Sequence, residues 1–231
     1  MSKAPHIVRR LRTALTKLRS DTSALAFVEF ALVLPIFVAM MVGGIELSNY
    51  VTTKMRVSQL ALHGADHIAR IGSGSLLAAK QISETQINDV LTGVGLQAGR
   101  MNLYTNGRVI ISSLEPDPNH SGKYYIHWQR CQGLKTKTST YGAAGADNLS
   151  GMGPTGAQVT APANGQTIFV EVYYEYQPII NSRAFIINSS NTTLTRMDEI
   201  AAMPVRDARD TTQIYNTENA TVHNCSTYSA T

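Results

Sequence analysis

One carboxylate, Glu29, lies inside an apolar run in which no other residue is charged. The run extends over 22 residues, from Ala24 to Ile45. An ionised carboxylate inside a bilayer costs about 2.5–3.5 kcal/mol on insertion scales, so such a group needs either water or a positive partner. Glu29 could reach the interface at the cytoplasmic end of the run, or it could pair with a newly formed N-terminal amine. Both alternatives make it the first candidate for a functional residue.

The other chemistry-bearing residues do not form a recognisable catalytic or metal site. His63 and His67 would share a helix face, but the segment lacks the glutamate of the metalloprotease pattern, and we expect both side chains to be solvated. The sequence contains no nucleophile elbow, phosphate-binding loop or dinucleotide fingerprint. Close carboxylate pairs, which are common on exposed faces, occur at Glu171 and Glu175, Asp198 and Glu199, and Asp207 and Asp210. We therefore expect no enzyme activity, no cofactor and no metal.

The charge of the chain is divided between a basic leader and a slightly acidic remainder. Six of the 20 Lys and Arg residues lie within the first 20 positions, which contain no Asp or Glu. From residue 21 onward, 14 basic residues stand against 16 acidic ones, a net charge of −2. The overall charge of +4 therefore belongs to the leader and does not indicate binding to nucleic acid.

The apolar run has the length of a membrane-spanning helix. Twenty-two helical residues reach about 33 Å, enough to cross a hydrocarbon core of about 30 Å. A secretory signal has a shorter apolar core, of about 7–15 residues, and is followed by a small-residue cleavage site, which is missing here. We expect a retained single-pass anchor over residues 25–46. The positive-inside bias places residues 1–24 in the cytoplasm and the residues beyond about 47 outside.

Residues 20–35 read SDTSALAFVEFALVLP, which places Glu29-Phe30-Ala31-Leu32, and then Pro35, behind the basic leader. This order resembles the N-terminal signature of the TadE-like pseudopilins, which are minor components of tight-adherence (Tad, or Flp) type IVb pili. In that family a dedicated prepilin peptidase cuts after a Gly, and the Glu becomes the fifth residue of the mature chain. The resemblance implies cleavage between Ala24 and Leu25, with Ala24 in the place of the usual Gly.

The resemblance also implies a structural role with defined partners. These are the prepilin peptidase, other Tad pilins and pseudopilins, and the inner-membrane assembly platform. The freed amine of Leu25 would pair with Glu29 of a neighbouring subunit. The chain would lie in the bacterial inner membrane with its C-terminal domain in the periplasm, and it could enter a surface pilus.

Beyond the anchor, the sequence predicts a helical stalk over residues 47–72, so that one helix would extend from Leu25 to Ile71. A Gly-Ser-Gly-Ser segment then ends it. Apolar or small residues recur along the stalk at spacings of three and four, at Leu47, Val51, Met55, Ser58, Leu62, Ala65 and Ala69. We expect this face to pack against the protein's own domain, against neighbouring subunits, or against both.

Residues 73–231 are expected to form an extracytoplasmic α+β domain with an antiparallel sheet. A capping box at Ser83-Glu84-Thr85-Gln86 predicts a short helix over about 84–92, ended by Gly93. Asn106-Gly107 predicts a hairpin between the strands that flank it, at 101–104 and 109–113.

Further strands are predicted over 124–130 and 167–177, and shorter ones over 184–187 and 192–196. The alternation of apolar and mixed residues over 167–177 is typical of a strand with one buried and one open face.

Two segments of the domain lack periodicity. The Gly-rich residues 141–162 are expected to be either disordered or a functional surface loop, and the polar tail over 207–231 is expected to be weakly ordered. The two cysteines are Cys131 and Cys225, and an even number in an exported domain favours a disulfide. Such a bridge would hold the tail to the end of a strand.

Two functions remain open. The first is a pseudopilin or minor pilin in the biogenesis or initiation of a Tad-type pilus used for surface attachment. The alternative is an uncleaved, membrane-anchored periplasmic module that binds a ligand or acts as a scaffold. The N-terminus of the mature chain separates the two.

Overall fold

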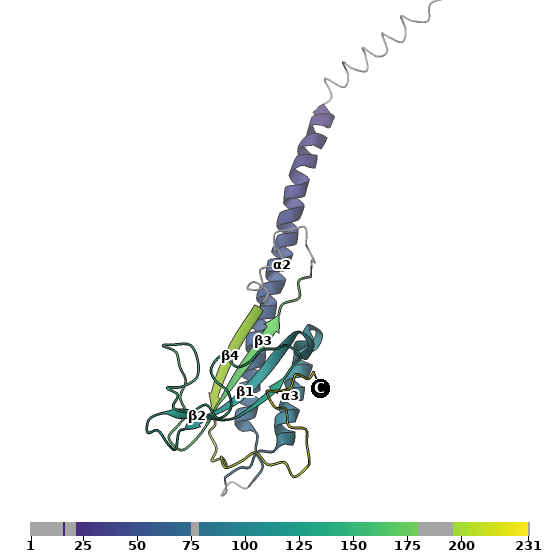
Figure 1. The fold of residues 1–231 in the computed structure, drawn as a ribbon. Helices are drawn as coiled ribbons and strands as arrows, with labels where there is room; N and C mark the ends of the chain where they lie inside the picture. Colours follow the sequence, from purple (N-terminus) through teal and green to yellow (C-terminus); the bar gives the residue numbers. More distant parts are fainter. Residues whose placement is uncertain (1–15, 17–21, 75–78, 180–195, 231) are drawn as a thin grey trace, which may run out of the picture. The chain divides into compact units, whose positions relative to one another are not determined.

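The computed structural model describes residue 16 and residues 22–74, 79–179 and 196–230. It contains a long apolar helix and a four-stranded antiparallel sheet with further helices, so the expected α+β class is confirmed (Figure 1). The chain divides into two compact units, one up to Asn49 and one from Tyr50 onward. Apart from residue 16 and residues 22–24, the predicted leader lies outside the described residues.

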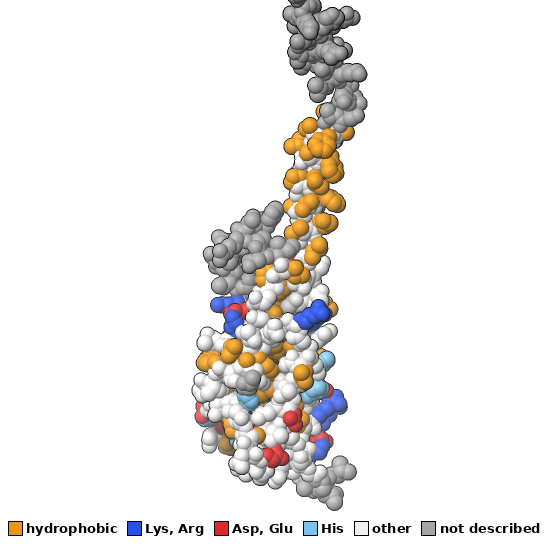
Figure 2. Space-filling view, turned by 90° about the vertical axis from the view of Figure 1, so that its right-hand side faces the viewer, with side chains coloured by type: hydrophobic (Ala, Val, Ile, Leu, Met, Phe, Trp, Pro, Cys, Tyr) orange, Lys and Arg blue, Asp and Glu red, His pale blue; other side chains and the backbone are white. Residues whose placement is uncertain are grey.

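The first unit contains the beginning of helix α2, Thr22–Arg70. α2 is the helix in the described part of the chain that is long and apolar enough to cross a membrane, with a window of 18 residues at a mean hydropathy of 2.5. None of that window is buried, and Figure 2 shows apolar side chains over the visible face of this unit. Pro35 lies inside the helix, as membrane helices tolerate. The helix predicted from Leu25 to Ile71 is therefore confirmed to within one residue at its C-terminal end.

In the second unit, α2 packs on the sheet along a face that is offset from the predicted one. Its buried apolar residues are Val57, Leu60, Ala61, Ala65, Ile68 and Ala69. Of the predicted face, Ala65 and Ala69 are buried, whereas Val51, Met55 and Leu62 remain 47%, 59% and 49% exposed. The larger side chains of that face therefore do not pack against the protein's own domain. Small residues let the helix approach closely, and a Cβ added at Gly64 would lie 3.5 Å from Val94.

Helix α3, Glu84–Ala98, begins at the predicted capping box. Gln86 N donates to Ser83 Oγ at 3.3 Å, and Ser83 N donates to Gln86 Oε1 at 3.2 Å. The predicted end at Gly93 was wrong, because Val94 and Ala98 continue the buried face of this helix beyond it.

The sheet has the strand order β2-β1-β3-β4, and all its neighbours are antiparallel. The strands are β1 Gly107–Pro116, β2 Tyr124–Gln132, β3 Thr167–Glu175 and β4 Arg196–Pro204. β2 and β3 confirm the strands predicted over 124–130 and 167–177. The segments 184–187 and 192–195 lie outside the described residues.

Most of β4 was not predicted from the sequence. It contains the charged residues Arg196, Asp198 and Glu199, and Ile200 is its only β-branched residue. Charged side chains are common on edge strands, where they discourage pairing with another chain. The charged residues that suit β4 to the edge of the sheet also interrupt the alternation of apolar residues, so this alternation did not predict the strand.

The hairpin predicted at Asn106-Gly107 was wrong. The chain forms a 3₁₀ turn, η1 Gly99–Met101, then a short helix, α4 Leu103–Asn106, and β1 starts at Gly107. A type I′ turn needs positive φ at both central residues, whereas Gly107 has φ −154°. Asn106 instead donates from Nδ2 to Met101 O at 3.1 Å and closes the helical turn.

The glycine at position 107 is required by close packing. A Cβ there would lie 2.2 Å from Tyr173 O and 2.9 Å from Leu103 O, and neither carbonyl belongs to a flexible side chain. We expect Gly107→Ala to lower the free energy of unfolding by about 1–3 kcal/mol, since overpacking forces the backbone to shift.

Gly93→Ala is the matched control, because a Cβ at that helical position meets nothing within 4 Å. Alanine there should raise the stability of the domain by about 0.5–1 kcal/mol. Urea unfolding followed by circular dichroism measures both variants. Equal stability of the two would contradict the assigned packing at Gly107.

Both faces of the sheet are covered. α2 and α3 pack on one face, with Val109, Ile111, Val170 and Val172 in the larger core cluster. The Gly-rich segment 141–162 covers the other face, where it forms a second cluster.

The buried members of the second cluster are Leu114, Ile126, Met152, Ala161 and Phe169, and Tyr141, Leu149 and Val159 pack against them. The predicted half-open face of β3 was therefore wrong, and the segment 141–162 is an ordered cover. Gly151 and Gly153, with φ 144° and 124°, permit its turns.

The tail after β4 is also ordered, against expectation. Arg209 donates to the carbonyl oxygens of Ile68 and Ala69, each at 3.2 Å, and also to that of Ile71, which satisfies the C-terminal end of α2. Burial lowers the pKa of Arg209 to about 10, so the group stays charged at neutral pH. Farther along, Glu84 N donates to Tyr215 O at 2.9 Å at the start of α3.

Candidate functional site

The predicted processing and assembly residues lie on the first part of α2. Ala24, Leu25, Glu29, Phe30, Ala31, Leu32 and Pro35 all belong to this helix. Each of these side chains from Leu25 onward is exposed in the first unit. Leu25 and Glu29 are four residues apart, so they lie on the same helix face, one turn from each other.

This geometry has a direct electrostatic consequence. If the chain began at Leu25, its amine would stand at the N-terminus of the helix, one turn from the carboxylate of Glu29. The rest of the surrounding surface is apolar, from Phe27 and Val28 through Phe30 and Leu32. In hydrocarbon such a carboxylate is stabilised by a positive partner, and the amine is the nearest group of that kind that this segment can supply.

A second exposed apolar surface lies on α2 within the second unit. Val51, Met55 and Leu62 follow each other at spacings of four and seven, and Ser58 lies between them. This is the spacing by which one helix packs along another. We call these four residues the stalk face. No described residue of the domain buries it.

The acidic pairs considered in the sequence have structural partners. Asp198 pairs with Lys137 at 3.1 Å and Glu199 with Lys54 at 3.9 Å. Glu175 pairs with Lys135, which together with a hydrogen bond from Tyr173 holds its pKa below the usual value despite partial burial.

The remaining carboxylates are engaged in the same way. Glu171 is buried, which raises its pKa, and it accepts hydrogen bonds from Ser139 Oγ and Thr140 N. Asp207 pairs with Lys80 at 2.6 Å, and Asp210 accepts bonds from Thr212 and Tyr215. These groups fix loops and strands in place, and none of them forms a pair poised for acid–base chemistry.

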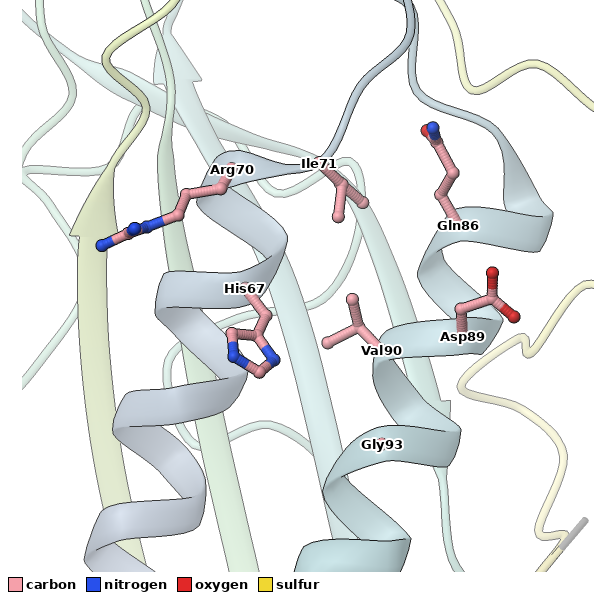
Figure 3. Close-up of a pocket in the computed structure, with 7 residues that line it drawn as sticks. All are labelled: His67, Arg70, Ile71, Gln86, Asp89, Val90 and Gly93. Atoms are coloured by element: carbon pink, nitrogen blue, oxygen red, sulfur yellow. The ribbon is translucent and has the colours of Figure 1, made fainter.

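His67 borders a shallow hollow between α2 and α3 (Figure 3). The hollow has a volume of about 370 Å³ and is lined by His67, Arg70, Ile71, Gln86, Asp89, Val90 and Gly93. His63 is bonded to Gln97 Oε1 at 3.2 Å, and Asp66 is paired with Arg70. The two histidines thus lie at the surface, as expected.

A disulfide joins Cys131, near the end of β2, to Cys225 in the tail. Beside it lies a buried cation that sequence reasoning missed, Arg108 of β1. Its guanidinium donates to Cys225 O at 2.8 Å and Thr227 O at 3.0 Å, and it lies 4.1 Å from the centre of the Tyr228 ring. Burial lowers the pKa of Arg108. The part of the tail around residue 225 is therefore held both by a covalent bond and by the guanidinium of Arg108.

Sequence reasoning also missed a polar cluster between β1 and β2. Glu115 is buried and accepts hydrogen bonds from Ser113 Oγ at 2.7 Å and Tyr125 OH at 3.2 Å. His127 lies 3.1 Å from the same carboxylate, and this hydrogen bond raises the pKa of the imidazole. No spacing rule pairs these residues, because a bulge between Ser113 and Leu114 shifts the register of the two strands.

Comparison with protein families matches residues 25–66 to the TadE-like protein family. No curated protein and no solved structure matches the chain. The matched region begins at the predicted first residue of the mature chain and extends through the stalk face. It ends before α3 and the sheet.

Proposed function

Because residues 25–66 match the TadE-like protein family, we propose that this chain is a pseudopilin that takes part in the biogenesis or initiation of a Tad-type pilus. The observation that carries the proposal is that the matched region contains an exposed apolar segment up to Ile45 and, farther along the same helix, the exposed stalk face. TadE-like pilus proteins are structural, which agrees with carboxylates engaged in packing and pairing. In this proposal α2 assembles with other subunits, and the domain that follows it is displayed outside the membrane.

Processing is the first step of the proposal. The basic leader keeps the N-terminus in the cytoplasm by the positive-inside bias. A prepilin peptidase removes residues 1–24 and leaves Leu25 as the first residue. Asp21 is lost with the six leading bases, so the mature chain would have 14 basic and 15 acidic side chains.

Assembly in the membrane is the second step. The amine of Leu25 pairs with Glu29 of a neighbouring subunit, which offsets the cost of a carboxylate in lipid. The domain that follows lies in the periplasm, where thiols are oxidised and the bond between Cys131 and Cys225 can persist. The partners are other Tad pilins and pseudopilins and the inner-membrane assembly platform.

Assembly outside the membrane uses the stalk face. Exposed apolar side chains at helical spacing are costly in water unless a partner covers them. A helix of a neighbouring subunit would bury Val51, Met55 and Leu62. This surface is separate from the face that holds α2 to its own sheet.

We expect Met55→Glu to weaken assembly while the domain keeps its fold, because Met55 is exposed and a charge there opposes helix packing. Co-purification with the other pilus subunits from solubilised membranes should fall by about tenfold or more, since burying an unpaired charge costs several kcal/mol. Arg56→Gln, a substitution at the next, exposed position, is the control. If the Met55 variant co-purified with the other subunits as well as the wild type does, the stalk face would have no part in assembly.

The alternative is an uncleaved membrane-anchored module, favoured by one observation: Ala24 stands where the family carries Gly. In that case residues 1–24 would remain, and Glu29 would lie near the cytoplasmic interface without an amine partner. Loss of surface pili and attachment in cells that lack this chain supports the pseudopilin, and intact pili in such cells support the anchored module.

A further inference from the structure

Three side chains of types that can bind a metal ion converge in loops outside helix α2. Asp117 and His120 come from the turn between β1 and β2, and Asp147 comes from the cover segment 141–162. Each offers one ligand atom, and these atoms all lie within 4.8 Å of one another. Two carboxylates and one imidazole thus meet from segments that are far apart in the sequence.

The central carboxylate is held firmly in place. Asp117 has a side chain only 1% exposed and accepts hydrogen bonds from Asn119 N at 2.8 Å and Asn148 N at 2.9 Å. The bond to Asn148 also brings the adjacent Asp147 towards it.

The cluster has an uncompensated negative charge. Among the residues that the structure describes, neither Asp117 nor Asp147 forms an ion pair with a lysine or an arginine. Lys123, in the same turn, donates to Ser150 Oγ. His120 Nδ1 lies 2.8 Å from Asp117 Oδ2, and the phenol of Tyr125 is also close enough to interact electrostatically with Asp117. Two close carboxylates of this kind repel each other unless a cation lies between them.

From this juxtaposition of Asp117, His120 and Asp147, we infer a binding site for a divalent transition-metal ion, with Zn²⁺ as its best match. Imidazole nitrogen and carboxylate oxygen are both ligands of Zn²⁺, whereas Ca²⁺ takes oxygen ligands alone. Three protein ligands leave a fourth position for water. His120 and Asp147 are solvent-accessible and can close the remaining distance by rotating their side chains.

The ion would act as a tie between two loops. The turn after β1 and the cover segment are already joined where Tyr124 and Leu149 exchange backbone hydrogen bonds of 2.9 Å. A metal at Asp117, His120 and Asp147 would add a second link beside it, over the cluster of Leu114, Ile126 and Phe169. Binding to the folded state alone would raise the unfolding temperature in the presence of the metal.

The other candidate histidines do not offer such a set. His63 and His67 lie on α2 with their ring centres 6.4 Å apart, and the acidic residue between them, Asp66, is engaged with Arg70. A pair on a helix can still bind Zn²⁺ weakly, so it must be removed in any test of the loop site.

The test uses the purified full-length double variant His63→Gln/His67→Gln in detergent. This protein is titrated with ZnCl₂, and calorimetry measures the binding. We expect one Zn²⁺ per chain in this background. Adding Asp147→Asn or His120→Gln should weaken binding by at least about 10–100-fold, with the fold kept, because both side chains are accessible. CaCl₂ should not compete.

Either of two results would overturn the inference. One is the absence of Zn²⁺ binding in the double variant, which would assign any wild-type signal to α2. The other is binding that Asp147→Asn and His120→Gln leave unchanged. Asp117→Asn is not used, since this side chain also holds the loop backbone.

Discussion

A chain with Glu29→Gln is expected to enter the membrane at least as well as the wild type and yet to fail in pilus assembly. Removal of the charge lifts an insertion cost of about 2.5–3.5 kcal/mol, because the amide is neutral in hydrocarbon. It also removes the partner that the amine of Leu25 needs in a neighbouring subunit. Insertion and assembly should therefore change in opposite directions.

Membrane fractionation and electron microscopy of cell-surface pili measure the two effects. Glu46→Gln is the matched control, since it neutralises another carboxylate of α2 at the far end of the apolar run. Glu29→Asp should retain part of the activity, because it keeps the charge but shortens its reach. Normal pili with Glu29→Gln would count against the proposed pairing.

Loss of the bond between Cys131 and Cys225 is the second large effect. The bond closes a loop with a sequence separation of 94, and its removal should lower the free energy of unfolding by about 2–5 kcal/mol. The double variant Cys131→Ser/Cys225→Ser leaves the tail held by Arg108 and Arg209. The region around residue 225 should then open before the sheet does.

Urea unfolding of the double variant measures the loss of stability, and limited proteolysis measures the opening of the tail. Arg108→Lys is a useful comparison, because lysine keeps the charge but cannot reach both Cys225 O and Thr227 O with one planar group. We expect early cleavage after residue 206 in the cysteine variant. An unfolding midpoint and a cleavage pattern equal to those of the wild type would show that the tail does not depend on the bond.

Local patterns in the sequence were enough to predict several helices and strands. The capping box at Ser83 gave the start of α3, and the alternation over 167–177 gave β3, because each depends on neighbouring residues alone. The even number of cysteines in a domain that we expect to be exported led to the pairing of Cys131 with Cys225. The apolar run and its charge distribution gave α2.

The errors arose where tertiary packing overrides local preference. Asn106-Gly107 has the composition of a turn, but Gly107 is needed where β1 passes close to the carbonyl of Tyr173. The Gly-rich segment 141–162 has no strand or helix periodicity, yet Met152, Val159 and other apolar residues of it pack in one cluster with Phe169. Neither requirement can be read from neighbouring residues.

The same limit applies to the candidate sites. The spacing of apolar residues did not show which side of α2 packs on the sheet, because small residues, and not the larger Val51, Met55 and Leu62, fit the close approach. The convergence of Asp117, His120 and Asp147 depends on a hydrogen bond between two loops, at Asn148 N. The spacing of the three residues in the sequence does not predict this convergence.

The most direct test of the central claim is the N-terminus of the chain isolated from membranes of its own cells. Intact-mass measurement and N-terminal sequencing should find that the chain starts at Leu25, with residues 1–24 removed. This start gives Glu29 an amine partner and a place in assembly. A mature chain that still begins at Met1, in cells whose other pilins are processed, would contradict the account and favour an uncleaved anchored module.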